Sequence, residues 1–135
     1  MIRANIIIAP CLLACLVLAA ACGGGGVELP KGFPQDFPVY AKATVEAATV
    51  DPEGGRFLVE WRSSDSPDQV RAFYEGELDK APWQVQNVQD IAEMETTVIS
   101  FARRDSSGEQ GTLAIATVRE DGQHVAMALS LTTPQ

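Results

Sequence analysis

Apolar residues recur at every second position in several segments of this chain, and this pattern predicts strands. Phe57, Val59 and Trp61 occupy alternate positions in one such segment, which is the period of a strand with one buried face. Five further segments show a similar alternation or are rich in Val, Thr and Ala. The predicted strands are residues 42–50, 57–62, 83–91, 97–101, 113–117 and 125–131.

One segment has the period of an amphipathic helix instead. Ser66 and Gln69 match the two partners of a capping box at its start. Pro82 places its end near residues 80–81. Gly76 costs about 1 kcal/mol relative to alanine in a helix, so we expect it to allow close packing against a sheet. The apolar stripe consists of Val70, Phe73, Tyr74, Leu78 and Ala81.

The predicted order of elements is ββαββββ. Because one amphipathic helix cannot cover two sheets, we predict an α+β fold with a single antiparallel β-sheet of about six strands and the helix packed on one face. The pair Asp121-Gly122 favours a hairpin between the last two strands. The opposite face of the sheet is expected to carry small side chains, namely Ala114, Ala116, Val118, Ala126, Ala128 and Ser130.

The start of the chain has the three-part pattern of a secretory signal peptide. Arg3 precedes an apolar run over residues 6–18, and small residues follow as far as Cys22. The run is shorter than the roughly 20 residues that a membrane-spanning helix prefers, and Pro10 lies inside it. We divide the chain into a signal peptide (1–21), a lipidated cysteine with a tether and a lead-in (22–41), and an α+β domain (42–135).

The segment between the signal peptide and the domain is flexible at first and then stiff. Glycines fill positions 23–26 and form a tether. Three prolines spaced four residues apart within residues 27–40 exclude a regular helix and favour extended backbone. Phe33, Phe37 and Tyr40 are expected to pin this lead-in onto the domain.

Charge and reactive residues exclude several classes of function. A net charge of −8 argues against nucleic acid, whose phosphates require a basic face. His124 is the only histidine and is expected at the surface, and no Gly-x-Ser-x-Gly signature is present. A zinc site needs several Cys, His or acidic ligands at close spacing. We therefore predict no metal, no cofactor and no enzymatic activity.

Two further pairs of residues have an ordinary and a functional interpretation. Trp61 and Trp83 each belong to an apolar face, so core packing is preferred over a role in an interface. Arg103 and Arg104 lie at a strand end, where they could clamp an anionic ligand or protect the sheet edge.

The residues before Cys22, Leu18-Ala19-Ala20-Ala21, resemble the lipobox of bacterial lipoproteins. The segment from Leu29 to Tyr40, the hairpin and helix that follow, and the strand that begins at Trp83 are similar to small uncharacterised bacterial lipoproteins. This resemblance implies that Cys22 carries acyl chains such as palmitate and anchors the protein in the cell envelope. In a bacterium with two membranes, Gly23 implies the outer membrane, facing the periplasm.

The resemblance implies a location and a fold but no activity. An ordinary cleaved signal peptide and an uncleaved anchor are the alternatives to lipidation, and all three place residues 27–135 outside the cytoplasm. Cys11 and Cys15 lie in the apolar run and leave with it, so no internal disulfide is expected in the mature chain.

Two functional hypotheses follow. The first is a non-enzymatic, lipid-anchored envelope protein that binds or scaffolds another envelope component, most simply a protein, through the open face or edge of the sheet. The alternative is a small-ligand or lipid carrier with an apolar cleft between helix and sheet. The residues expected to line that cleft are Trp61, Phe73, Leu78 and Phe101.

Overall fold

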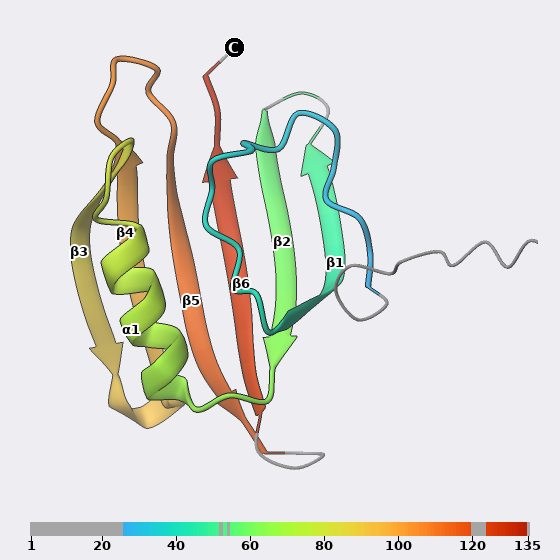
Figure 1. Cartoon of the computed structure of the whole chain (residues 1–135), viewed down its shortest axis with the longest axis vertical. Coiled ribbons are helices and arrows are strands. Elements are labelled where there is room, and N and C mark those ends of the chain that lie inside the picture. The colour runs from blue at the N-terminus through green and yellow to red at the C-terminus, as the bar shows by residue number, and fades with distance from the viewer. Residues whose placement is uncertain (1–25, 52, 54, 120–123, 135) are drawn as a thin grey trace, which may run out of the picture.

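The computed structural model describes residues 26–51, 53, 55–119 and 124–134, and it contains the predicted order of elements (Figure 1). One six-stranded antiparallel sheet carries a single α-helix on one face, so the predicted fold class is confirmed. A short 3-10 helix, η1, precedes the fourth strand. The elements are β1 (Ala43–Asp51), β2 (Arg56–Ser63), α1 (Pro67–Glu77), β3 (Trp83–Ile91), η1 (Ala92–Met94), β4 (Thr96–Arg103), β5 (Gln110–Val118) and β6 (His124–Thr132).

The strand order in the sheet is β1-β2-β6-β5-β4-β3. Two pieces build it: the hairpin of β1 and β2, and the meander from β3 to β6, joined side by side through β2 and β6. The connection from β2 to β3 therefore runs to the opposite edge of the sheet, and α1 lies on this connection (Figure 1).

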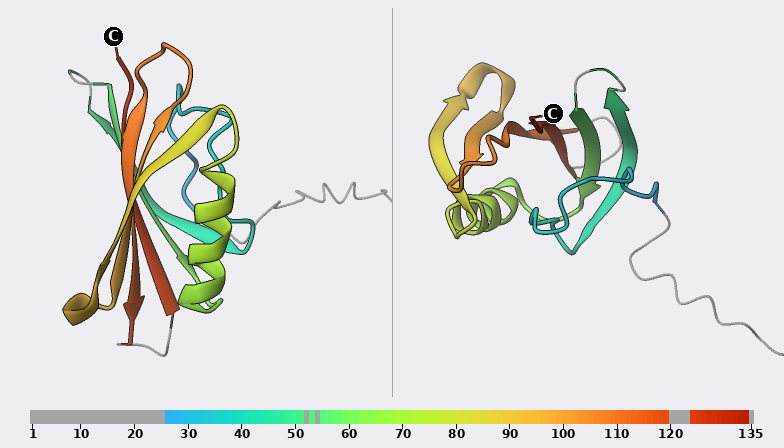
Figure 2. Two further views of the ribbon diagram at one scale, coloured as in Figure 1. Left: turned by 90° about the vertical axis from the view of Figure 1, so that its left-hand side faces the viewer. Right: turned by 90° about the horizontal axis from the view of Figure 1, so that it is seen from above.

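Residues 27–40, which we call the strap, lie on the same face of the sheet as α1 (Figure 2). In Figure 1 the helix covers the half of the sheet that contains β3 to β5, and the strap crosses β6 and β2. Phe33 and Phe37 of the strap are both only 4% exposed. The expectation that aromatic side chains pin this segment onto the domain is thus confirmed for both.

The core lies between the sheet and the layer formed by α1 and the strap. Alternate residues of the strands face it, as the burial of every second residue along β2 shows. Trp61 and Trp83 are 1% exposed, which confirms their assignment to the core. The largest fully buried side chains are those of Trp61, Trp83, Tyr74, Phe101, Leu78, Ile99, Leu113 and Met127.

The helix begins as predicted but ends earlier. The Ser66 side chain accepts from the backbone of Gln69, whose side chain accepts from the backbone N–H of Ser66, so the capping box is present. The helix ends at Glu77. The backbone N–H of Leu78 donates the last hydrogen bond of the helix, to the Tyr74 carbonyl, and the chain turns after it.

The expectation of close packing at Gly76 is wrong. The residue is exposed, and a Cβ built on it meets nothing within 4 Å. Val70, Tyr74 and Leu78, spaced four residues apart, face the sheet. Gly76 lies midway between the last two, and its side of the helix therefore faces solvent.

Several predictions fall on residues that the structure does not describe. The signal peptide, Cys22, the glycines 23–25 and the Asp121-Gly122 turn lie outside the described residues. The hairpin around that turn is confirmed, since β5 and β6 pair in register as far as Val118 and His124. Across the described ranges, no helix is both long and apolar enough to span a bilayer.

Candidate functional site

The four residues predicted to line a cleft surround the interior between α1 and the sheet. Trp61 and Phe101 come from the sheet and are 1% exposed, and Leu78 at the end of α1 is fully buried. Phe73 is half-buried at the margin of the same cluster, where its ring lies 5.0 Å from that of Tyr74.

The ring of Phe37 fills the centre of this interior. Its centroid lies 6.3 Å from that of Trp61, 5.7 Å from that of Phe101 and 6.0 Å from that of Trp83. A fourth ring, that of Tyr74 on α1, is 6.4 Å away. These centroid distances are typical of favourable aromatic pairs. A side chain of the strap therefore lies between the helix and the sheet here, beside the direct contact of Tyr74 on α1 with Trp61 on β2.

A salt bridge fastens the strap beside this ring. The guanidinium of Arg103 donates from Nη1 to Asp36 Oδ2 at 2.6 Å and from Nη2 to Asp36 Oδ1 at 2.8 Å. Arg103 also donates from Nη2 to Glu109 Oε2 at 2.8 Å and from Nε to the same oxygen at 3.1 Å. Trp83 lies under the guanidinium, 4.3 Å from its carbon to the ring centroid, and donates from Nε1 to the Asp36 carbonyl at 3.1 Å.

Both partners of this salt bridge titrate away from their ordinary range. Hydrogen bonds from Arg103 hold the pKa of the Asp36 carboxyl below its usual value of 3.8. Hydrogen bonding to Asp36 is also the main reason that the pKa of Arg103 is raised. The Arg103 side chain is 10% exposed and that of Asp36 is 45% exposed. The guanidinium is therefore largely buried, and the carboxylate lies on its solvent side.

The hydroxyl of Tyr74 forms a second attachment for the strap. It accepts a hydrogen bond from Trp61 Nε1 at 3.1 Å and another from the backbone N–H of Tyr40 at 3.1 Å. Burial raises the pKa of Tyr74 well above its normal value of 10.0. Tyr40 itself donates from its hydroxyl to Asp65, which ties the end of the strap to the loop before α1.

Sequence reasoning missed the roles of Asp36 and Tyr74 and the position of Phe37 inside the cleft. The available signals were indirect: Asp36 is the acidic residue next to Phe37 in the lead-in, and Arg103 was a candidate anion clamp at a strand end. Arg103 does clamp an anion, the carboxylate of its own chain. Arg104 donates instead to the backbone carbonyls of Trp83 and Asp79.

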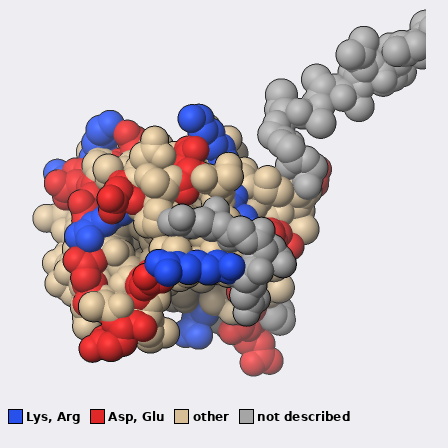
Figure 3. All heavy atoms as spheres, turned by 90° about the horizontal axis from the view of Figure 1, so that it is seen from below, with Lys and Arg blue, Asp and Glu red and all other residues tan. Residues whose placement is uncertain are grey.

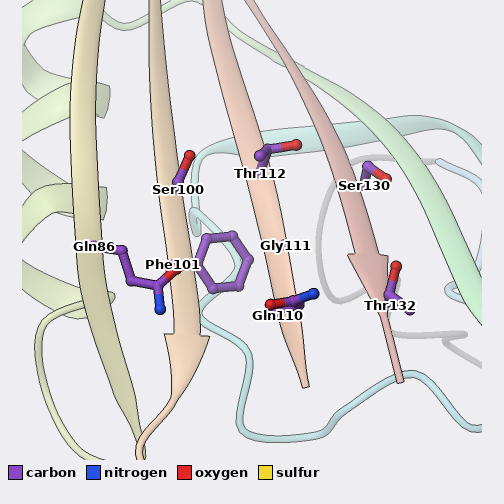
Figure 4. A pocket seen from close by; sticks show the side chains of 8 residues that line it. All are labelled: Gln86, Ser100, Phe101, Gln110, Gly111, Thr112, Ser130 and Thr132. Carbon is purple, nitrogen blue, oxygen red and sulfur yellow. The ribbon is translucent and has the colours of Figure 1, made fainter. Parts of the chain in front are cut away.

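The opposite face of the sheet carries small and uncharged side chains on β5 and β6, as predicted, whereas β2 places the charged Glu60 and Arg62 on it. Ser100, Thr112 and Ser130 lie side by side on β4, β5 and β6 (Figure 4). They line a shallow hollow of about 330 Å³, which adjoins a second hollow of about 190 Å³ beside Leu58, a residue 50% exposed. None of the three side chains makes a hydrogen bond within the described part of the chain.

His124 is half-buried at the start of β6, so the expectation of a surface position is only partly met. It borders an open hollow of about 500 Å³ with Ser63, Ser64 and Glu46. No hydrogen bond joins its ring to another described residue.

Acidic and basic side chains are interspersed on the end of the molecule seen in Figure 3. Among the described residues, no three His, Cys, Asp or Glu side chains gather as a metal site would require.

Comparison with known proteins gives one match. No curated protein and no solved structure shows significant similarity to the chain. The START domain-like family matches residues 44–124, more than half of the chain, and this range contains α1 and the strands from β2 to β5 but not the strap. The chain therefore belongs to the START domain-like family.

Proposed function

We propose that this protein is a non-catalytic binding domain of the cell envelope, anchored through lipid on Cys22, that holds an apolar small molecule or a lipid between α1 and the sheet. One observation carries this proposal. Phe37, which lies outside the family's range of residues 44–124, fills the interior of the part that the family defines.

The interior around Phe37 has the character of a ligand site. Trp61, Tyr74, Trp83 and Phe101 surround it, and the Tyr74 hydroxyl accepts a hydrogen bond from Trp61 Nε1. Small-molecule sites are mostly lined by apolar and aromatic side chains with a few placed polar groups. Because protein interiors are close-packed, the space must be filled by a side chain or by a ligand.

The family supports binding rather than catalysis, since START-like domains are typically binding domains. The arrangement around His124 agrees with this, because no described hydroxyl or carboxylate hydrogen-bonds to its ring. A nucleophile and a base within hydrogen-bond reach are what acyl-transfer chemistry requires.

Uptake of an apolar probe by a strap variant tests the ligand site. Phe37→Ala in the full-length protein is expected to bind a neutral naphthylamine dye with a blue-shifted emission, and to retain lipid detectable by native mass spectrometry. Val39→Ala is the matched control, because Val39 lies in the same strap but is 37% exposed. A folded Phe37→Ala protein that takes up neither dye nor lipid would contradict the proposal.

The anchor is tested separately. Radiolabelled palmitate is expected to enter the wild-type protein but not Cys22→Ser, and only the wild type is expected to fractionate with membranes. In a bacterium with two membranes we expect the protein to fractionate with the outer membrane and to face the periplasm. An unlabelled wild-type protein in the soluble fraction would overturn the anchored location and leave the ligand site to its own test.

The open face of the sheet favours a second candidate function, the docking of an envelope protein. Leu58 is exposed there beside a hollow, and Ser100, Thr112 and Ser130 present unused donors and acceptors. A photo-crosslinking residue at position 128, in the middle of this face, is expected to form an adduct with a defined protein. The same residue at position 94, in η1, should form none. Equal crosslinking at both positions would argue against this function.

A further inference from the structure

Two adjacent residues of the strap together have the chemistry of an amphiphile. Asp36 offers a carboxylate to Arg103, and Phe37 places an apolar group in the aromatic interior next to it. The charged end is 45% exposed and the apolar end is 4% exposed. A headgroup at the surface and an apolar body inside is the arrangement that a bound fatty acid would have.

The receptor for the carboxylate does not depend on the strap for its position. Arg103 is held by Glu109 through two hydrogen bonds and lies over the Trp83 ring. Both of these partners belong to the family's range of residues 44–124. If the strap leaves, Arg103 keeps its orientation and two of its donors lose their acceptors, as does Trp83 Nε1, which donates to the Asp36 carbonyl.

We infer that the ligand of the proposed site is a long-chain carboxylate, whose headgroup takes the place of the Asp36 carboxylate on Arg103 and whose apolar chain takes the place of Phe37. This inference rests on the proposed function, because it names the class of ligand for the same interior. The strap is then an internal competitor that the ligand displaces.

Charge favours a carboxylate over a phosphate monoester. The planar guanidinium matches a carboxylate with two parallel hydrogen bonds, which is the geometry that Asp36 already uses. Glu109 contributes one negative charge beside Arg103. A single additional negative charge, as Asp36 supplies now, is tolerated there, whereas a dianion would be repelled by Glu109.

The test compares two ligands of equal chain length, palmitic acid and cetyl alcohol, by displacement of the naphthylamine dye from the full-length Phe37→Ala protein. Removal of the ring weakens the competitor and leaves Arg103 in place. The acid is expected to bind about tenfold more tightly than the alcohol, which corresponds to the charge-assisted hydrogen bonds that only the acid makes. Wild-type protein should show the same preference with weaker binding of both.

Substitution of Arg103 decides whether the preference arises at this residue. Arg103→Gln in the Phe37→Ala background is expected to abolish the preference for the acid. Arg104→Gln, which removes the same charge from the neighbouring position, should preserve it, because Arg104 donates to backbone carbonyls and not to Asp36. Circular dichroism and dye binding of each variant establish that the fold and the apolar interior persist.

The possible outcomes separate this inference from the proposed function. Binding of acid and alcohol with equal affinity, or a preference that survives Arg103→Gln, overturns the inference and leaves the apolar site intact. Failure of the folded Phe37→Ala protein to bind dye, acid or alcohol overturns both. If Arg103→Gln does not fold, Asp36→Asn with native Arg103 provides the second measurement: freed of its competitor, Arg103 should bind the acid more tightly than in wild type, and unchanged or weaker binding contradicts the inference.

Discussion

Asp36 and Arg103 form a bidentate salt bridge at 2.6 and 2.8 Å although 67 positions separate them in the chain. The bond connects the strap, which leads from the proposed anchor, to the end of β4. It lies beside the ring of Trp83, which also packs against the rings of Phe37 and Phe101. Attachment of the strap and closure of the aromatic interior are therefore parts of one contact.

The Asp36–Arg103 salt bridge should stabilise the protein less at acid pH. The pKa of Asp36 is lowered in the folded protein from 3.8, so its contribution to stability is complete above that value and is lost as the pH falls through the lowered pKa. We expect the difference in free energy of unfolding between wild type and Asp36→Asn to be constant near neutral pH and to shrink below about pH 4.

Urea unfolding measured over this range of pH checks the prediction, with Asp105→Asn as the control. The pKa of Asp105 is also lowered, chiefly by a hydrogen bond from Ser107, but Asp105 does not hold the strap. A protease site in the strap should become cleavable at acid pH in both wild type and Asp105→Asn, because both proteins keep the Asp36–Arg103 bond. Absence of this change in Asp105→Asn would contradict the expected mechanism.

The second prediction concerns the aromatic interior. Phe37→Ala is expected to lower the free energy of unfolding by about 3–5 kcal/mol, because truncation leaves a cavity among four aromatic rings. Val39→Ala should cost less than about 1 kcal/mol, since its side chain is 37% exposed. Urea unfolding measures both, and equal costs for the two variants would contradict the role assigned to Phe37.

The third prediction concerns the Tyr74 hydroxyl. Tyr74→Phe removes the acceptor for Trp61 Nε1 and for the backbone N–H of Tyr40. An unsatisfied buried donor costs about 1–3 kcal/mol, and we expect a loss in that range by thermal or urea unfolding. Tyr40→Phe is the control, because its hydroxyl binds the more accessible Asp65. A larger loss for Tyr40→Phe would show that burial is not the deciding factor.

The fourth prediction contrasts two glycines. Gly76→Ala is expected to raise the free energy of unfolding by about 1 kcal/mol, because the position is helical and a Cβ meets nothing within 4 Å. Gly111→Ala is expected to lower it by about 1–3 kcal/mol. A Cβ there would lie 2.6 Å from the Ser130 carbonyl oxygen and 2.8 Å from the Phe101 ring. Urea unfolding of the pair should therefore give changes of opposite sign.

Local patterns predicted the elements well, for a physical reason. The alternation of Phe57, Val59 and Trp61 and the capping box of Ser66 and Gln69 involve neighbours in sequence, so each can be read without knowledge of the rest of the chain. The prediction that Gly76 packs against the sheet was wrong, because the low helix propensity of glycine does not tell which side of a helix faces the sheet.

The candidate site was only half predictable. Trp61, Phe101 and Leu78 were placed in one interior from their apolar spacing, and the structure brings them into one core cluster. The position of Phe37 at its centre was not predictable, because an aromatic residue in a proline-rich segment has no period that indicates where it packs.

The sequence by itself determined the number and order of the strands and the α-helix, the burial of alternate residues in strands such as β2, and the expectation of an envelope location that rests on Cys22. The tertiary structure alone decided the strand order, with β2 beside β6, and the contact of Asp36 with Arg103. The reason is the range of the forces involved: periodicity and capping act between near neighbours, whereas these pairings depend on how separate surfaces meet once the chain is compact.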